Sequence, residues 1–205
     1  MTGRLTDSER VAAGLSTPSP VLFTGIVDLH HSDGAYDPAA VRAGGIAAMI
    51  HKATEGLDWR DPKFTAAMDA CKVHGLARGA YHFASGNGDG AAQADFFLSV
   101  VGDRAELLVL DLETNHGSAG NMTLANAVAF VTRVREVTGR WPVFYGYLSM
   151  LRAECSRATP EQRAVLARCP LWLAAYGADP LTVKVPSAWE RWDLMQYTNG
   201  SDGPA

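Results

Sequence analysis

The chain alternates between short apolar segments and segments with helical periodicity, and this alternation limits its possible folds more than any other feature. Strands are predicted at Val21–Leu29, Ile46–Ile50, Leu76–Phe83, Leu107–Leu112, Pro142–Tyr145, Leu171–Ala175 and Trp192–Tyr197, with a further short strand at Leu181–Val185. Helices are expected between them, because parallel strands cannot be joined by a tight turn. Seven or eight such strands favour a parallel α/β barrel over an open sheet.

The segments between the strands carry the start and stop signals of helices. Asp37 and Asp61 are each followed by proline, which is favoured at the first helical position, and Thr159–Gln162 has the pattern of a capping box. Gly75 and Gly102 follow the last apolar residue of two helical stripes, where glycine commonly ends a helix. These signals predict helices of ordinary length between the strands.

Composition places the chain among ordinary globular proteins. It has 205 residues, of which 47% are hydrophobic and 20% charged, enough for one domain with a sizeable core. The net charge of −4 provides no basic field for nucleic acid or an anionic membrane. The 3 cysteines include no C-x-x-C pair, so we expect neither a disulfide framework nor a structural zinc site. We expect residues 1–20 to form a flexible leader and residues 21–205 to form a single monomeric barrel domain.

Two carboxylates follow the apolar strand Leu107–Leu110. Asp111 and Glu113 are two residues apart, so on a strand they face the same side, with Cα atoms about 6–7 Å from each other. Like charges this close raise the pKa of one acid, which keeps a proton available near neutral pH. The pattern therefore predicts an acid–base pair. The alternative is a pair of loop acids, one of which caps a helix.

Polar and aromatic residues also collect at the carboxyl ends of the other predicted strands, where a parallel barrel carries its chemistry. The set consists of Asp28, His30, His31, His51, Lys52, Thr54, Glu55, Tyr81, His82, Phe83, Asp111, Glu113, Tyr145, Trp172, Tyr176, Gln196 and Tyr197. Sugars have flat apolar faces and hydroxyl rims, so aromatic rings around carboxylates suit a glycan-binding groove.

Seven sequence blocks occur in an order that resembles a known family. They are GIVDLHH (25–31), IHKATEG (50–56), GAYHF (79–83) with the following AAQADFF (91–97), LDLE (110–113), GRWPVFYG (139–146), PLWLAAYG (170–177) and MQYTNG (195–200). Together they resemble the glycoside hydrolase family 25 lysozymes, which are bacterial and phage muramidases. The resemblance implies an α/β fold, a modified (β/α)8-like barrel with mostly parallel strands. It also implies hydrolysis of the β-1,4 bond between N-acetylmuramic acid and N-acetylglucosamine in peptidoglycan.

The resemblance implies a role for each of three acids. Glu113 would be the general acid, Asp111 would stabilise positive charge or position the substrate's acetamido group, and Asp28 would line the same floor. A close carboxylate pair favours retention of configuration, but substrate-assisted enzymes depart from that scheme, so the nucleophile stays open. The predicted substrate-binding residues are His30, Lys52, Tyr81, His82, Tyr145, Trp172, Tyr176 and Gln196. Neither a metal nor another cofactor is implied.

The chain also departs from the family pattern. Leu29 runs directly into His30 and His31, where the family often has a serine or tyrosine before the histidine. The family's further strand with one more acid has no counterpart before Ala205. We therefore expect an open groove and reduced activity. Lys52 could pair with Glu55 or contact the substrate.

Two other functions remain open on the sequence alone. One is a weakened barrel that binds cell-wall glycan without cutting it. The other is a metal-dependent hydrolase that uses His30, His31 and His82 with Asp28. The sequence shows no signal peptide and no apolar run of membrane-spanning length. For an enzyme that acts on the cell wall, this predicts synthesis in the cytoplasm and release by lysis or by a non-standard route.

Overall fold

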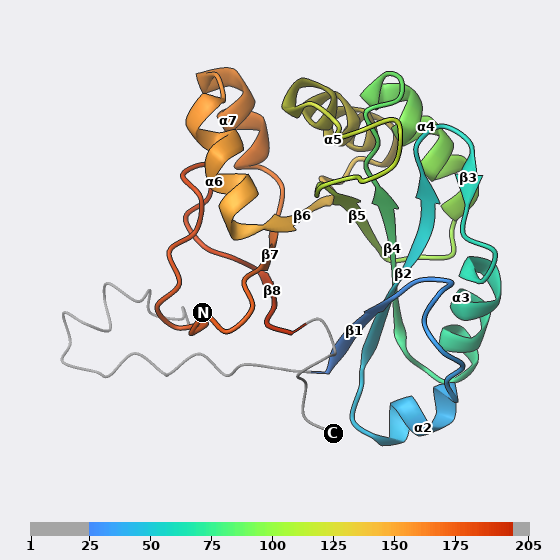
Figure 1. Ribbon diagram of the computed structural model, residues 1–205. Helices are drawn as coiled ribbons and strands as arrows, with labels where there is room; N and C mark the ends of the chain where they lie inside the picture. Colours follow the sequence, from blue (N-terminus) through green and yellow to red (C-terminus); the bar gives the residue numbers. More distant parts are fainter. Residues whose placement is uncertain (1–24, 199–205) are drawn as a thin grey trace, which may run out of the picture.

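The computed structural model describes residues 25–198 and contains one curled sheet of eight strands (Figure 1). The sheet order is β1-β2-β4-β5-β6-β7-β8, and all these neighbours pair in parallel. The strands are β1 (Ile26–Leu29), β2 (Ala48–Glu55), β3 (Trp59–Arg60), β4 (Ala77–Phe83), β5 (Leu107–Asp111), β6 (Val143–Tyr147), β7 (Leu171–Ala174) and β8 (Leu194–Gln196). The short β3 is antiparallel to the end of β2. The predicted barrel-like α/β fold with mostly parallel strands is confirmed.

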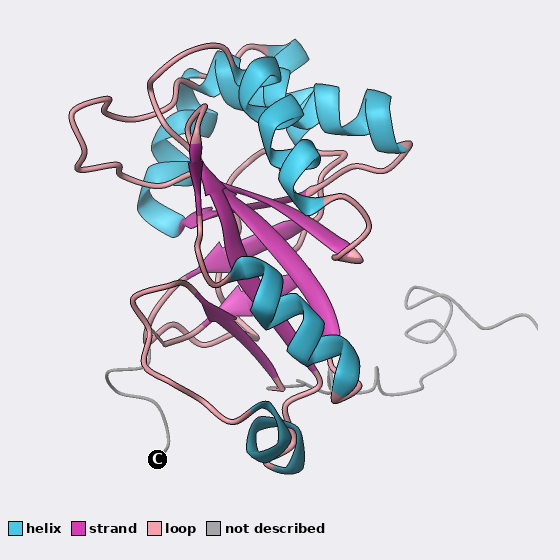
Figure 2. Ribbon diagram, turned by 90° about the vertical axis from the view of Figure 1, so that its right-hand side faces the viewer, coloured by secondary structure: helices cyan, strands magenta, loops and turns pink. Residues whose placement is uncertain are grey.

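Helices connect the strands and cover the outer face of the sheet (Figures 1 and 2). They are α2 (Pro38–Ala43), α3 (Phe64–Val73), α4 (Gly90–Val101), α5 (Leu124–Thr138), α6 (Leu148–Arg157) and α7 (Pro160–Leu166). The Asp37 carboxylate caps α2, and Thr159 with Gln162 forms the predicted capping box of α7. None of the helices within residues 25–198 is long and apolar enough to cross a membrane.

Several predicted boundaries were wrong. Helix α3 begins at Phe64 without a side-chain cap, because the Asp61 carboxylate bonds the backbone N–H groups of Lys63 and His31 instead of those of the first helical turn. Helix α6 was not predicted, since only Leu151 and Cys155 are buried on it and they give too weak a stripe. Strand β3 has two residues and was also missed.

The short strand predicted at Leu181–Val185 does not form. The Asp179 side chain accepts from the Leu181 N–H, and the Asp179 carbonyl accepts from Thr182 and Val183, so these groups close a turn. The last strand is also shorter than predicted and spans Leu194–Gln196. The predicted leader (1–20), the first residues of the first predicted strand (21–24) and the chain end (199–205) lie outside the described residues.

The core has two layers because side chains alternate along each strand. On β5, Leu108 and Leu110 join the large apolar cluster between sheet and helices. Val109 belongs to a smaller cluster inside the barrel, with Ile50, Val143, Tyr145, Trp172 and Ala174. This alternation sends Asp111, two residues after Val109, toward the interior. The packing of the strand thus decides which side the acid faces.

Candidate active site

Asp111 and Glu113 lie where β5 ends. Both side chains face the same side, the interior of the barrel, as predicted. Asp111 is only 6% exposed, and its Oδ1 atom has no hydrogen-bond partner among the described residues. Burial raises the pKa of Asp111 well above its usual value, the negative charge of Glu113 raises it further, and Lys52 opposes the shift. Burial and the charge of Asp28 also raise the pKa of the half-buried Glu113. The pair therefore retains a proton at a pH where isolated carboxyls have lost theirs.

Asp28 reaches the same interior from β1. Gln196, on β8, donates from Nε2 to both carboxylate oxygens of Asp28, at 3.1 and 3.0 Å. Burial raises the pKa of Asp28, and the hydrogen bond from Gln196 counteracts part of that shift. Asp28 in turn raises the pKa of Asp111 and Glu113 through its charge. The structure thus brings the three predicted acids into one electrostatic cluster, which we call the acid cluster (Asp28, Asp111 and Glu113).

Lys52 supplies positive charge beside the acid cluster. Its Nζ atom lies 2.7 Å from Glu55 Oε2, so of the two alternatives left open for Lys52 the structure shows the ion pair with Glu55. A bulge in β2 between Lys52 and Thr54 brings Lys52 and Glu55, three residues apart, to the same side. Nζ also lies 4.8 Å from the ring centre of Trp59 and 4.5 Å from that of Phe83. Lys52 is therefore held in place and lowers the pKa of both Asp111 and Glu113.

Aromatic side chains border the acid cluster on the side of β6 and β7. The hydroxyl groups of Tyr145 and Tyr176 each donate to Gln196 Oε1 at 2.8 Å. The rings of Tyr145 and Trp172 meet edge to face with centres 4.7 Å apart. Tyr176 is 54% exposed, so its ring is open to a ligand. Burial raises the pKa of Tyr81 on β4, and Asp111 adds to that shift, which places Tyr81 in the same group.

His82 does not join this group, although it was predicted to bind substrate. His82 is fully buried on the opposite face of β4, where its ring bonds Thr54 Oγ1 at 2.8 Å and Gln93 Oε1 at 3.0 Å and stacks on Phe130. Burial lowers the pKa of His82 to about 4. His30 lies in the turn after β1, within 3.7 Å of Asp33.

His31 bonds Asp61 through Nδ1 at 3.2 Å. Within residues 25–198, no group of three or more His, Cys, Asp or Glu side chains has an arrangement that could hold a metal ion. The metal-dependent alternative therefore gains no support from the described residues.

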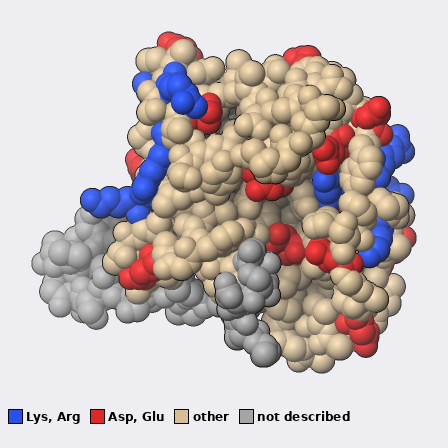
Figure 3. All heavy atoms as spheres, viewed as in Figure 1, with Lys and Arg blue, Asp and Glu red and all other residues tan. Residues whose placement is uncertain are grey.

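One face of the molecule is hollowed. Figure 3 shows acidic side chains bordering a hollow near the middle of the face that is turned to the viewer in Figure 1. An acid cluster with aromatic rings beside it can accept a neutral chain of sugars and deliver a proton to it.

The chain matches the model of a known protein family over most of its length. The model of the glycosyl hydrolases family 25 matches residues 27–204. The chain belongs to glycosyl hydrolases family 25.

Relatives of this family 25 chain agree with the match. It is 32% identical to Lysozyme M1 of Streptomyces globisporus over 84% of this chain and 60% of that protein. It is 31% identical to the N,O-diacetylmuramidase of a Chalaropsis species over 80% of this chain and 85% of that protein. The chain thus spans about three fifths of the length of Lysozyme M1.

Solved structures share the fold. The bacterial lysozyme of Streptomyces coelicolor superposes with a TM-score of 0.73 at 29% identity, covering 84% of this chain and 82% of that chain. The GH25 lysozyme of Aspergillus fumigatus superposes with a TM-score of 0.71 at 27% identity, covering 83% and 85%. The resemblance read from the sequence blocks is therefore confirmed, and the chain is a glycoside hydrolase by family.

Two residues of the site were not predicted from the sequence of this family 25 chain. Trp59, on the unpredicted β3, packs its ring near Lys52. Asn115 is 7% exposed and donates to Glu55 Oε1 at 3.3 Å. Asn115 lies in the loop after β5, where the strand period no longer applies, so no local sequence signal indicated it.

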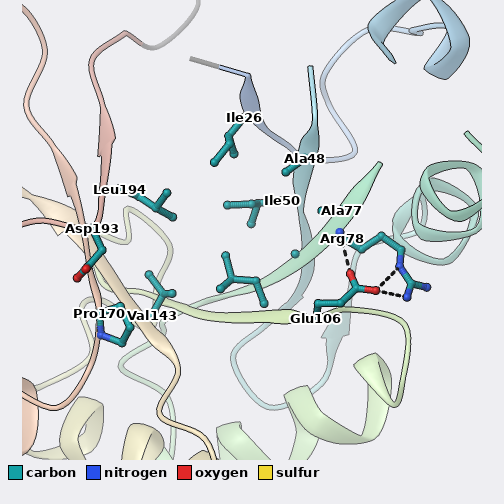
Figure 4. A pocket seen from close by; sticks show the side chains of 12 residues that line it. Ile26, Ala48, Ile50, Ala77, Arg78, Glu106, Val143, Pro170, Asp193 and Leu194 are labelled. Atoms are coloured by element: carbon teal, nitrogen blue, oxygen red, sulfur yellow. Dashed lines mark hydrogen bonds and ion pairs between the residues drawn. The ribbon is translucent and has the colours of Figure 1, made fainter. Parts of the chain in front are cut away.

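A second concavity lies at the opposite end of the barrel, where the strands begin (Figure 4). It is a cavity of about 280 Å³ lined mainly by apolar side chains such as Ile26, Ile50, Val143 and Leu194. Glu106 stands at its border and bonds the Arg78 backbone N–H at 2.8 Å and the Arg78 guanidinium group. Its acids have partners and it has no aromatic rim, so we do not place the chemistry there.

Proposed function

We propose that this chain is a muramidase that hydrolyses the β-1,4 bond between N-acetylmuramic acid and N-acetylglucosamine in peptidoglycan. The observation that carries the proposal is the acid cluster at the carboxyl end of a family 25 barrel, with pKa values raised by burial. The names of the relatives, lysozyme and N,O-diacetylmuramidase, support the same substrate.

In the proposed reaction, Glu113 is the general acid. It is half-buried, so its pKa is raised while its carboxyl group stays within reach of a substrate, whereas Asp111 is buried. Glu113 gives its proton to the glycosidic oxygen as the bond to the anomeric carbon breaks. The resulting carboxylate then takes a proton from the water that completes hydrolysis.

Asp111 acts on the other side of the breaking bond. Its carboxylate is buried beside Glu113 at the floor of the site, from which its negative charge can stabilise the positive anomeric carbon or position the substrate's acetamido group. Positioning of the acetamido group gives a substrate-assisted route, and the charge of Asp111 gives a route by direct stabilisation or covalent attack. The routes with an acetamido or a carboxylate nucleophile displace the anomeric substituent twice and therefore retain the configuration of the sugar.

The exposed rings at this end bind the glycan. Tyr176 is 54% exposed and Tyr81 is half-buried, so their rings can contact a sugar. Tyr145 and Trp172 were predicted to bind substrate, but they are buried and pack beneath the acid cluster. Lys52 acts on the charge of the acids, because its ammonium group is occupied by Glu55. We leave His82 out of the binding surface, because it is buried on the helix side of the sheet.

The test is cleavage of purified cell walls. The loss of turbidity is followed together with the new reducing ends, and the products are separated to identify the sugar at each new end. A muramidase leaves N-acetylmuramic acid at the reducing end. Binding to the walls without new reducing ends would replace the enzyme by the glycan-binding barrel. A rate that falls on addition of a chelator would point instead to the metal-dependent hydrolase.

A further inference from the structure

The two ends of the sheet meet without a backbone ladder. Strands β1 and β8 are the outer members of the strand order, and no pairing joins them within residues 25–198. Within these residues, backbone hydrogen bonds therefore do not close the sheet into a barrel. Asp28 and Gln196 instead bridge β1 and β8 by their side chains.

Every polar atom of the Gln196 amide is engaged by protein. Nε2 faces both oxygens of Asp28, at 3.1 and 3.0 Å, and Oε1 accepts the hydroxyl groups of Tyr145 and Tyr176 at 2.8 Å each. Gln196 was predicted to bind substrate, but these contacts leave its amide no free group for a sugar.

The Asp28 carboxylate determines how the amide is turned. An ionised carboxylate only accepts hydrogen bonds, so a reversed amide would place Oε1 against it. The NH₂ group therefore points at Asp28, and Tyr145 and Tyr176 donate to Oε1 and hold the amide in place. A neutral amide also leaves the charge of Asp28 in place, whereas Lys or Arg would cancel it.

We propose that Gln196 is a positioning residue that holds the Asp28 carboxylate ionised and in place within the acid cluster, with Tyr145 and Tyr176 anchoring its amide through Oε1. This rests on the proposed function, since it assumes that Asp28 acts in the reaction. The negative charge of Asp28 in turn helps Glu113 keep its proton. A substitution at Gln196 should therefore change the pH dependence of the reaction as well as its rate.

Other charged groups around Asp28 must be considered in that pH dependence. Asp33 and His30 act on Asp28 from the turn after β1. Across the interior, the groups that interact with Asp28 are Asp111, Glu113, Tyr81, Tyr145 and Tyr176. None of these changes in the variant below, so a shifted profile reports on residue 196.

Gln196→Glu is the decisive variant. It keeps an oxygen for the two tyrosine hydroxyls and turns the other amide position into a carboxyl that faces Asp28. Two carboxyls that share a proton are harder to ionise, so we expect the acidic limb of the kcat profile to move up by about one pH unit. We expect kcat at the optimum to fall about tenfold, with KM changed by less than about threefold, because misplacement of a catalytic group affects the chemical step. An unshifted acidic limb would overturn the proposal.

Tyr176→Phe tests the same link with little risk to folding, because Tyr176 is 54% exposed. It removes one of the two donors to Oε1 and keeps the ring, so we expect a loss of kcat of about two- to fivefold with KM nearly unchanged. The matched control is Tyr36→Phe, whose hydroxyl bonds Met49 away from the groove and should leave kcat as it is. If Gln196→Glu does not fold, an unchanged kcat in Tyr176→Phe overturns the proposal by itself.

Glu113→Gln is measured beside these variants to separate the two proposals. If Glu113→Gln still cleaves cell walls at the normal rate, the proposed function fails. If Glu113→Gln is inactive and Gln196→Glu keeps the normal pH profile, only the positioning role of Gln196 fails.

Discussion

The acids at the two ends of the barrel interior have pKa values that are shifted in opposite directions. At the amino end, Glu106 bonds both the backbone and the guanidinium group of Arg78. Partial burial tends to raise the pKa of Glu106, but the bonds from Arg78 outweigh it and the pKa lies below its usual value. At the carboxyl end, burial raises the pKa of Asp111 and Glu113, and one oxygen of Asp111 has no partner among the described residues.

The acid at the amino end is therefore suited to stabilising the fold, and the acids at the carboxyl end are suited to catalysis. An acid with a lowered pKa is stabilised in its ionised form, whereas an acid with a raised pKa stores a proton and destabilises the folded chain when it ionises. Parallel barrels commonly carry their reactive groups at the carboxyl ends of the strands and stabilising contacts at the other end. Substitutions of acids at the two ends should therefore differ in their effects on activity and stability.

The largest effect is expected for Glu113→Gln. The amide keeps the shape of the side chain but cannot donate the proton, so we expect the rate of reducing-end release to fall at least about 10²-fold, the usual scale of general acid catalysis. Glu190→Gln, at an exposed position in the loop before β8, is the matched control. A near-normal rate in Glu113→Gln would remove Glu113 from the role of general acid.

The second prediction concerns pH. One carboxyl of the pair must be protonated and one ionised, so the rate should follow a bell-shaped profile and fall about tenfold per pH unit outside its limbs. Because burial raises the pKa of both acids, the descending limb should lie above the usual range of carboxyl groups. A profile that stays flat from pH 4 to pH 8 would contradict a shared site.

Much of the carboxyl end of the barrel could be predicted from the sequence, because side chains alternate between the two faces of a strand. Alternation at the end of β5 placed Asp111 and Glu113 together, and the structure brings the predicted Asp28 to them from β1. The same period explains the error at β4. Tyr81 and His82 are neighbours and cannot both face the interior, and Tyr81 takes that side.

Other parts of the site depend on long-range contacts that no local pattern contains. The bulge in β2 turns Glu55 toward Lys52, and the neighbouring sequence has no feature that indicates a bulge. The link between Asp28 and Gln196 joins residues 168 positions apart. Only the closing of the sheet on itself brings them together.

The third prediction concerns stability and uses Asp111→Asn. The pKa of Asp111 is higher in the folded than in the unfolded chain, so its stabilising contribution is present at acid pH and is lost as the pH rises through the folded value. Asn cannot ionise. We therefore expect a higher Tm than in the parent chain at pH 7, by about 2–4 °C per kcal/mol, and a difference that shrinks toward pH 3. Activity should fall in the same variant.

The control for that measurement is Asp69→Asn, on the exposed side of α3. Surface substitutions usually change stability by less than about 0.5 kcal/mol, so its Tm should follow the parent at every pH. A lower Tm for Asp111→Asn at pH 7 would mean that the ionised carboxylate is stabilised by contacts, and the contrast between the two ends would disappear.

The smallest effect is expected at the amino end, for Glu106→Gln. Gln keeps an oxygen for the Arg78 backbone N–H and loses the ion pair, and the Glu106 side chain is 57% exposed. Exposed ion pairs contribute about 0–1 kcal/mol, so the loss of stability should stay within that range and vanish at about 1 M salt, where charges are screened over about 3 Å. The rate of wall cleavage and its pH profile should not change, because Glu106 lies where the strands begin. A slower rate at unchanged Tm would show that the amino end takes part in the reaction, and chemistry would no longer be confined to the carboxyl end.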